Sequence, residues 1–396
     1  MKIQERIIYG LMVAILIISC FCVAEHYAIP MEKDVYTETA SYKNVTSGMI
    51  VTELFSGRVL SENNADTVME MASTTKILTA YLAIRSQDLQ KHVTITKEMC
   101  NIEGSSIYLK EGEIWTLEQL LYGVMLRSGN DAATAVAIAT AGSVENFVAQ
   151  MNDFASKLQL KNTKFANPHG LHDKNHYTTA RELAKITACA MKHPVFAKIA
   201  KTKLVTFLRP DGASVSFGNK NKLLNTFDGA CGVKTGYTKD AGRCLVSAAT
   251  RNGMTLIGVV LNTADMWEQT KNMLNTSFNT YALYNLLGPN KLFPFTFQGA
   301  SLYAGNFFPA FYPLTQEEFS HLKYEVSWTF ADKKHLDLKK PVGEVSIFTQ
   351  NRLLFSKKIY TILHVDEISL GNNKERLYEN QQIFSGERCC QPQKCG

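Results

Sequence analysis

The chain has 396 residues, 45% of them hydrophobic and 20% charged, which is long enough for two domains with substantial cores. Its net charge of +6 fits work beside anionic polymers or membrane headgroups, but such a mild value mostly indicates solubility. The sequence has no basic block with interleaved aromatic residues, so nucleic acid is excluded as a predicted partner.

The start of the chain has the pattern of an export signal. Lys2 and Arg6 form a short basic region, and residues 7–24 are almost continuously apolar. We favour cleavage after Ala24. Two alternatives remain: a lipobox that would leave Cys20 lipidated, and an uncleaved membrane anchor. Each of the three places the rest of the chain outside the cytoplasm, and membrane contact is expected only through this segment.

The first predicted secondary structure is a β-hairpin over residues 47–60, because apolar and polar residues alternate around a turn at Ser56-Gly57. A buried helix follows, and Ser73 and Lys76 stand at its start. Residues three apart share one helix face, so the hydroxyl and the amine are neighbours. A serine nucleophile needs a base, and a lysine can serve when burial or a second cation, here Lys234, lowers its pKa.

A second polar motif, Ser128-Gly129-Asn130, lies in the loop between two predicted helices. The first of these helices opens with a capping box at 116–119, and the second runs through Ala141 with Asp131 as its expected cap. A loop between buried helices is well placed to fix polar side chains at a cleft. Asn130 could hold the lysine and a substrate carbonyl, and Ser128 could pass a proton to a leaving group.

Two more helices are predicted, one capped by Ser143 and one by Thr179, on either side of a histidine-rich loop. His169, His172 and His176 fall within eight positions, which raises the question of a metal site. Their spacing is not a usual zinc pattern, and no cysteine or carboxylate cluster completes it. We therefore predict no metal and no cofactor.

The strands of the sheet are predicted from the turns that join them. Residues 228–229 form a predicted turn that precedes one strand. Asn252-Gly253 is a strong hairpin signal between two predicted strands, at 244–250 and 254–261. These strands are expected to pair with the amino-terminal hairpin in one antiparallel sheet. A last helix, over about 267–287, is expected to close the domain.

The third motif, Lys234-Thr235-Gly236-Tyr237, is predicted at the end of the strand that follows residue 229. Lys234 and Thr235 offer a cation and a hydroxyl group to a substrate carboxylate. Gly236 allows an extended substrate to approach the backbone closely.

Cysteine usage gives no metal-ligand spacing. Cys231 and Cys244 flank the third motif and could face each other across two strands, so a bridge is conceivable, although two buried thiols are preferred. The polar tail carries Cys389, Cys390 and Cys395, which are prone to oxidation where they are exposed.

From about residue 292 the texture changes to short alternating runs without long helices, which predicts a small all-β domain that serves as a spacer or stabilising module. The predicted class is α+β, with helical clusters around an antiparallel sheet. The predicted divisions are a signal peptide (1–24), a linker (25–44), a catalytic domain (45–289), a β domain (290–388) and a flexible tail (389–396).

The motifs in this order resemble the serine-type D-alanyl-D-alanine carboxypeptidases, the low-molecular-mass penicillin-binding proteins. The resemblance covers about 44–388 and includes the loop block 167–171. It implies a penicillin-binding or β-lactamase-like domain followed by a β domain. It also implies removal of the terminal D-alanine from peptidoglycan pentapeptide stems, with β-lactams as covalent inhibitors.

The resemblance assigns a role to each motif residue. Ser73 would carry the acyl group, Lys76 would be the base, and Ser128 with Asn130 would pass the proton and orient substrate. Lys234 and Thr235 would hold the terminal carboxylate. The backbone N–H groups of Ser73 and Tyr237 would form the oxyanion hole.

The sequence departs from the family pattern in two places. Several relatives carry an arginine after the hairpin that follows the third motif, and residues 262–267 contain none. Many relatives end in an amphipathic membrane-binding helix, whereas residues 372–396 are polar. Carboxylate binding is therefore expected to rest on Lys234 and Thr235, and no carboxy-terminal membrane attachment is predicted.

Three alternative functions share the same motifs. A class A β-lactamase needs a Glu-x-x-x-Asn element between the second and third motifs, and neither Glu145 nor Glu182 has an asparagine four residues on, so fast β-lactam hydrolysis is not expected. A DD-endopeptidase acting on cross-links differs only in cleft shape. A non-catalytic β-lactam sensor or wall-binding module would be expected to have lost Ser73, Lys76 or Lys234, and all three are present.

Overall fold

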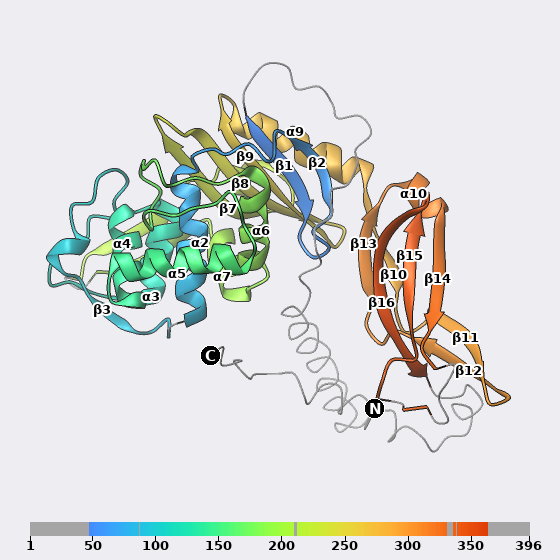
Figure 1. The fold of residues 1–396 in the computed structure, drawn as a ribbon. Coiled ribbons are helices and arrows are strands. Elements are labelled where there is room, and N and C mark those ends of the chain that lie inside the picture. The colour runs from blue at the N-terminus through green and yellow to red at the C-terminus, as the bar shows by residue number, and fades with distance from the viewer. Residues whose placement is uncertain (1–46, 87, 210–211, 331–335, 338, 363–396) are drawn as a thin grey trace, which may run out of the picture. The chain divides into compact units, whose positions relative to one another are not determined.

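The computed structural model describes residues 47–362 apart from 87, 210–211, 331–335 and 338 (Figure 1). The predicted signal segment, the linker and the tail with its cysteines lie outside these residues. The described residues fall into two compact units. The larger comprises 47–284 with 312–315, and the smaller comprises 285–311 with 316–362.

The larger unit is built on one antiparallel sheet of five strands in the order β2-β1-β9-β8-β7. The strands are β1 (Gly48–Glu53), β2 (Val59–Asn63), β7 (Ala230–Thr238), β8 (Gly242–Arg251) and β9 (Met254–Thr263). The predicted pairing of the amino-terminal hairpin with the later strands is therefore confirmed. Asn252 and Gly253 both have positive φ, at 50° and 78°, as a tight two-residue hairpin turn requires.

Helices cover both faces of this sheet because its strands are apolar on both faces. Along β1, Ile50 packs into the core shared with the main helical cluster, while Met49 and Val51 pack into a second core with α9. The helical elements are η2 (Ala72–Thr75), α2 (Lys76–Ser86), α3 (Leu117–Tyr122), η4 (Gly123–Arg127), α4 (Asn130–Ala141), α5 (Val144–Lys157), α6 (Ala180–Met191), α7 (Pro194–Lys201), α8 (Leu223–Thr226) and α9 (Met266–Thr280).

Figure 1 shows α2 to α7 gathered in one cluster, with α2 running through it. The apolar side chains of α2 are buried, as its sequence predicts, and so is Lys76. Short strand pairs complete the cluster. They are β3 (His92–Thr94) with β4 (Ile114–Thr116) and β5 (Leu204–Leu208) with β6 (Ser214–Gly218), and η3 (Lys97–Met99) follows β3.

Three of the four predicted helix caps are confirmed. The side chains of Thr116, Ser143 and Thr179 each accept a hydrogen bond from the backbone N–H three residues on. The prediction for Asp131 is wrong: α4 begins at Asn130 with Gly129 as its N-cap, and the Asp131 carboxylate turns to another loop.

The prediction of one helix over 267–287 is also wrong in its second half. Helix α9 ends at Thr280, and residues 282–287 form strand β10 (Ala282–Leu287), which pairs with β13 (Ala310–Leu314). Thr280 and Tyr281 belong to the β-branched and aromatic residues that favour extended structure. Strand pairing satisfies the backbone groups that a longer helix would have satisfied internally.

The smaller unit is an antiparallel sheet in the order β11-β12-β16-β15-β14, as its alternating sequence predicts. Its strands are β11 (Leu292–Phe297), β12 (Ala300–Gly305), β14 (Leu322–Trp328), β15 (Gly343–Thr349) and β16 (Arg352–Ile362), with one short helix, α10 (Gln316–Ser320). The all-β prediction is confirmed for the described part.

Among the described residues, no single helix has the length and hydropathy needed to cross a bilayer. Only α4 and α5, bent by 83° at their junction, reach those values as a pair.

Candidate active site

Ser73 lies on a tight turn at the amino-terminal end of α2. The hydroxyls of the two following residues hold this turn: Thr74 Oγ1 donates to the Met71 carbonyl at 2.6 Å, and Thr75 Oγ1 donates to the Ala72 carbonyl at 2.8 Å. Ala72 has a φ of +45°, which is unusual for a residue other than glycine. The turn leaves the Ser73 side chain partly exposed while its neighbours are buried.

Lys76 is fully buried, at 0% exposure, beside that serine. Its Nζ lies 2.9 Å from Ser73 Oγ, 2.7 Å from Asn130 Oδ1 and 2.6 Å from the His169 carbonyl oxygen. These three partners are neutral oxygens. Burial, followed by the charges of Lys234 and Lys220, lowers the pKa of Lys76 well below the usual value for lysine.

The three contacts accommodate the neutral amine, which the lowered pKa of Lys76 favours. A neutral lysine has two N–H donors and one lone pair. The amide oxygen of Asn130 and the carbonyl of His169 can only accept, so they take the two N–H groups. In the protonated form Lys76 Nζ also donates to Ser73 Oγ, at 2.9 Å, while the Ser73 hydroxyl donates to the His169 carbonyl at 3.4 Å. Loss of one proton from Nζ turns a lone pair toward Ser73 Oγ at the same distance. This arrangement can activate a serine hydroxyl as a nucleophile.

Asn130 is held in one orientation by backbone on both sides. Its Nδ2 donates to the Glu103 carbonyl and its backbone N–H donates to the Ser105 carbonyl, which fixes Oδ1 toward Lys76. Ser128, two residues earlier, is buried and has a left-handed φ of 64° where η4 ends. The predicted second motif therefore places Asn130 in direct contact with Lys76 and Ser128 in the turn that leads to Asn130.

The third motif lies on edge strand β7 and runs beside the nucleophile turn. A Cβ on Gly236 would lie 3.1 Å from the Ser73 backbone nitrogen, so only glycine allows this close approach without displacement. Lys234 is buried, and its Nζ donates to the Thr235 carbonyl at 2.9 Å. Thr235 is half-buried, whereas Tyr237 is 66% exposed.

A third lysine adds positive potential that the sequence motifs do not reveal. Lys220 Nζ donates to Ser105 Oγ at 3.0 Å, in the loop that holds Asn130. Burial and the charge of Lys220 lower the pKa of Lys234 to about 7. Lys220 lies in an ordinary polar stretch, so no local signal marks it.

The buried ring of His176 makes a hydrogen bond to the nucleophile turn. Its Nδ1 accepts from the Ala166 N–H at 3.0 Å, so its Nε2 carries the proton and donates to Thr75 Oγ1 at 2.7 Å. Only the neutral ring satisfies both contacts. Burial lowers the pKa of His176 to about 4.

This histidine predicts a loss of stability in acid. The unfolded imidazole titrates near 6.5 and the folded one near 4, so between these values the unfolded state binds more protons. The free energy of unfolding therefore decreases as pH falls from 6.5 to 4, by on the order of 3 kcal/mol from His176. Urea denaturation at pH 7.0 and 4.5 should show a smaller loss in His176→Gln than in the wild type. Equal pH dependence would contradict this assignment.

Asp131, which does not cap α4, holds the loop that leads to Asn130. Its carboxylate accepts from the backbone N–H groups of Ile107 and Leu109 at 3.1 Å and from Ser106 Oγ at 2.5 Å. These bonds tie the loop to the first turn of α4.

Replacement of Asp131 by asparagine should lower the free energy of unfolding by about 2 kcal/mol, because an amide nitrogen cannot accept from those donors. The matched control is Asp153→Asn, which removes a surface ion pair with Lys157 and should cost less than about 0.5 kcal/mol. Urea denaturation measures both, and a loss no larger than the control's would exclude the structural role of Asp131.

The three histidines of the loop have separate surroundings. His169 contributes its carbonyl oxygen, His176 its buried ring, and His172 lies at the surface against Glu70. They do not converge on a common point.

The described cysteines are free thiols, at positions Cys100, Cys189, Cys231 and Cys244. The preference for two thiols over a Cys231–Cys244 bridge is therefore confirmed, although Cys231 is only half-buried. Cys244 lies opposite Gly236 on the neighbouring strand.

Comparison with known proteins agrees with this geometry. A family model described as D-alanyl-D-alanine carboxypeptidase matches residues 36–265. The chain is 32% identical over 261 residues to DacF of Bacillus subtilis, covering 64% of this chain and 67% of that protein. It is 40% identical over 222 residues to a D-alanyl-D-alanine carboxypeptidase of a Streptomyces species, covering 52% and 76%.

Among solved structures, penicillin binding protein 5 from Haemophilus influenzae superposes with a TM-score of 0.68 at 26% identity, over 82% of this chain and 98% of that one. This match extends beyond the region of the family model. On the family match, the sequence identities and the fold together, the chain belongs to the D-alanyl-D-alanine carboxypeptidases, the low-molecular-mass penicillin-binding proteins.

Proposed function

We propose that this chain removes the terminal D-alanine from peptidoglycan pentapeptide stems through an acyl-enzyme on Ser73. The observation that carries the proposal is the environment of Lys76, a fully buried amine with a lowered pKa whose Nζ lies 2.9 Å from Ser73 Oγ. A neutral lysine at that distance is a general base poised for the serine proton.

In the acylation step, Ser73 Oγ attacks the carbonyl carbon of the penultimate D-alanine while its proton passes to Lys76. The oxyanion that forms is bound by the backbone N–H groups of Ser73 and Tyr237, each worth roughly 3 kcal/mol in comparable sites. Ser128 then delivers its hydroxyl proton to the departing amine and regains a proton from Lys76, with Asn130 orienting the substrate. D-Alanine leaves, and water hydrolyses the ester to restore Ser73.

The terminal carboxylate of the substrate is the group that selects a carboxypeptidase reaction. Lys234 and Thr235 bind it in this proposal, and Lys220 adds positive charge close enough to lower the pKa of Lys234. The charge of Lys220 offsets the lack of arginine in residues 262–267. The substrate backbone lies along β7, where Gly236 leaves room.

β-Lactams acylate the same Ser73 and are released slowly, because the chain lacks the Glu-x-x-x-Asn element that activates a deacylating water. Members of this family act on peptidoglycan outside the cytoplasm. Export through the segment 1–24, with cleavage preferred over lipidation at Cys20 or retention as an anchor, is the matching route. We assign the catalytic domain to residues 45–289 and the role of a spacer to the β domain that follows.

The test compares three substrates with the purified chain: a pentapeptide ending in D-Ala-D-Ala, the same peptide ending in D-Ala-L-Ala, and a cross-linked dimer. We expect D-alanine release from the first alone. Cleavage confined to the dimer would replace the proposal with an endopeptidase. If no substrate is cleaved and penicillin does not label the protein, a non-catalytic wall-binding module would be the better description.

A further inference from the structure

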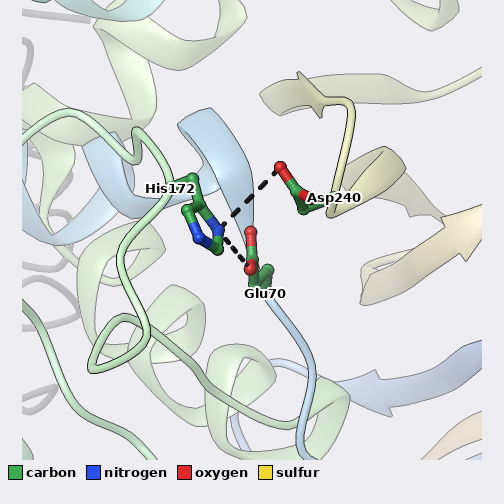
Figure 2. A group of neighbouring side chains, drawn as sticks. All are labelled: Glu70, His172 and Asp240. Carbon is green, nitrogen blue, oxygen red and sulfur yellow. Dashed lines mark hydrogen bonds and ion pairs between the residues drawn. The ribbon is translucent and has the colours of Figure 1, made fainter.

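A second cluster of chemically active side chains lies apart from the Ser73–Lys76 pair. Figure 2 shows Glu70, His172 and Asp240 converging from three segments that are far apart in sequence. His172 Nδ1 lies 2.6 Å from Glu70 Oε1 and 3.9 Å from Asp240 Oδ2. The side chains of His172 and Asp240 are 56% exposed and that of Glu70 is 24% exposed, so the cluster is open to solvent.

Hydrogen bonds hold the backbone beside two of the three residues, Glu70 and His172. Met69, which precedes Glu70, exchanges two hydrogen bonds with Thr178, at 2.8 and 2.9 Å. Asn167 spans the loop before His172, and its Nδ2 donates to the Leu171 carbonyl at 3.0 Å. The Glu70 and His172 side chains therefore project from fixed points.

Asp240 is held in the turn between β7 and β8. Thr238 Oγ1 accepts from the Ala241 N–H at 2.9 Å, which closes this turn around Asp240. Three anchored segments thus present one imidazole nitrogen and two carboxylates to a common point.

The spacing of the ligand atoms suits a metal ion. One potential ligand atom from each residue lies within 4.8 Å of the other two. Ligands at about 2.1 Å from a tetrahedral ion are about 3.4 Å apart. The two separations from His172 Nδ1, 2.6 and 3.9 Å, lie on either side of that value, and the third lies within 4.8 Å. An entering ion replaces the hydrogen bond between His172 and Glu70, and rotation of the exposed side chains adjusts the remaining distances.

We propose that Glu70, His172 and Asp240 form a binding site for a divalent transition-metal ion of the Zn²⁺ type, with water completing the coordination shell. The imidazole nitrogen selects this class over Ca²⁺ and Mg²⁺, which prefer oxygen ligands. The two carboxylates balance the charge of the ion. Nearby Asp173 adds a further negative charge at His172.

Metal binding at this point links the segments that carry the serine site. Glu70 lies three residues before Ser73, His172 lies three residues after His169, and Asp240 lies four residues after Gly236. The bound ion cross-links the nucleophile turn, the histidine loop and the β7–β8 turn. Because the three ligands come together only in the folded chain, binding stabilises the folded state.

The experiment is a titration of the metal-free full chain with Co²⁺, followed by its visible absorption. One equivalent with weak d–d bands and no thiolate-to-cobalt charge-transfer band is expected, which separates this site from the cysteines of the chain. His172→Gln should reduce the apparent affinity at least tenfold. The matched control, His92→Gln, removes another exposed imidazole and should leave the titration unchanged.

A second readout uses Zn²⁺ and thermal unfolding. Zn²⁺ should raise the Tm of the wild type and of His92→Gln by a few degrees, and should not raise that of Asp240→Asn. Equal binding by wild type and His172→Gln, a thiolate signature alone, or no binding by the wild type would each overturn the proposal. None of these results depends on peptidase activity.

Discussion

Replacing Lys76 by arginine is expected to slow acylation of Ser73 by roughly 10²–10⁴-fold, the range that a positioned general base contributes. Arginine keeps its proton at any pH at which the protein is folded, so it cannot present a lone pair to Ser73 Oγ. Stopped-flow measurement with a fluorescent penicillin gives the rate, and a thermal melt verifies that the variant is folded.

The matched variant is Lys234→Arg, which keeps a cation where the proposal needs only a cation. The acylation rate of Lys234→Arg should fall far less than that of Lys76→Arg, although the substitution places a larger side chain at a buried position. In the wild type, acylation should slow on acidification as Lys76 takes up a proton, at a pH below the ordinary titration of lysine. Similar rates for Lys76→Arg and the wild type would remove Lys76 from the mechanism.

Replacing Gly170 by alanine is expected to lower the free energy of unfolding by about 2–5 kcal/mol, since left-handed strain adds to overpacking. Gly170 has a φ of +90°, and a Cβ there would lie 1.9 Å from the Ala72 carbonyl oxygen and 2.9 Å from the Ser73 nitrogen. These atoms belong to the backbone of the nucleophile turn, so the clash displaces the turn as well. Acylation should therefore fall together with stability.

The control for this prediction is Gly112→Ala. Gly112 has a similar φ of +84° but nothing within 4 Å of the added Cβ, so only the left-handed strain of about 1–2 kcal/mol applies. Urea denaturation of the two variants separates steric overlap from backbone strain. An equal loss in both would mean that the loop moves away from Ala72 without cost.

Features set by short-range geometry could be predicted from the sequence. The spacing of Ser73 and Lys76 follows from the helix repeat, and the pairing of β8 with β9 follows from alternation and the Asn252-Gly253 turn. Family resemblance supplied the expectation that the three motifs meet, and the structure places Asn130 on Lys76 and Gly236 beside Ser73.

Features set by contacts between distant segments could not be predicted. Lys220 and His176 act on the site through Ser105 and Thr75, each about a hundred residues away along the chain, and no local pattern encodes such a contact. Asp131 is a residue type that often caps helices, yet its carboxylate accepts hydrogen bonds from three donors in the 106–109 loop instead of capping α4. The predicted end of α9 was wrong because the strand that follows it, β10, pairs with residues 310–314, which are distant in sequence.

The most direct test of the central claim is mass spectrometry of the protein trapped with a β-lactam, followed by peptide mapping. Activation of Ser73 by Lys76 predicts one adduct with the mass of the intact drug, located on Ser73 and absent from Ser73→Ala. An adduct on another residue, such as Ser128, or no adduct in the folded wild-type protein, would contradict it.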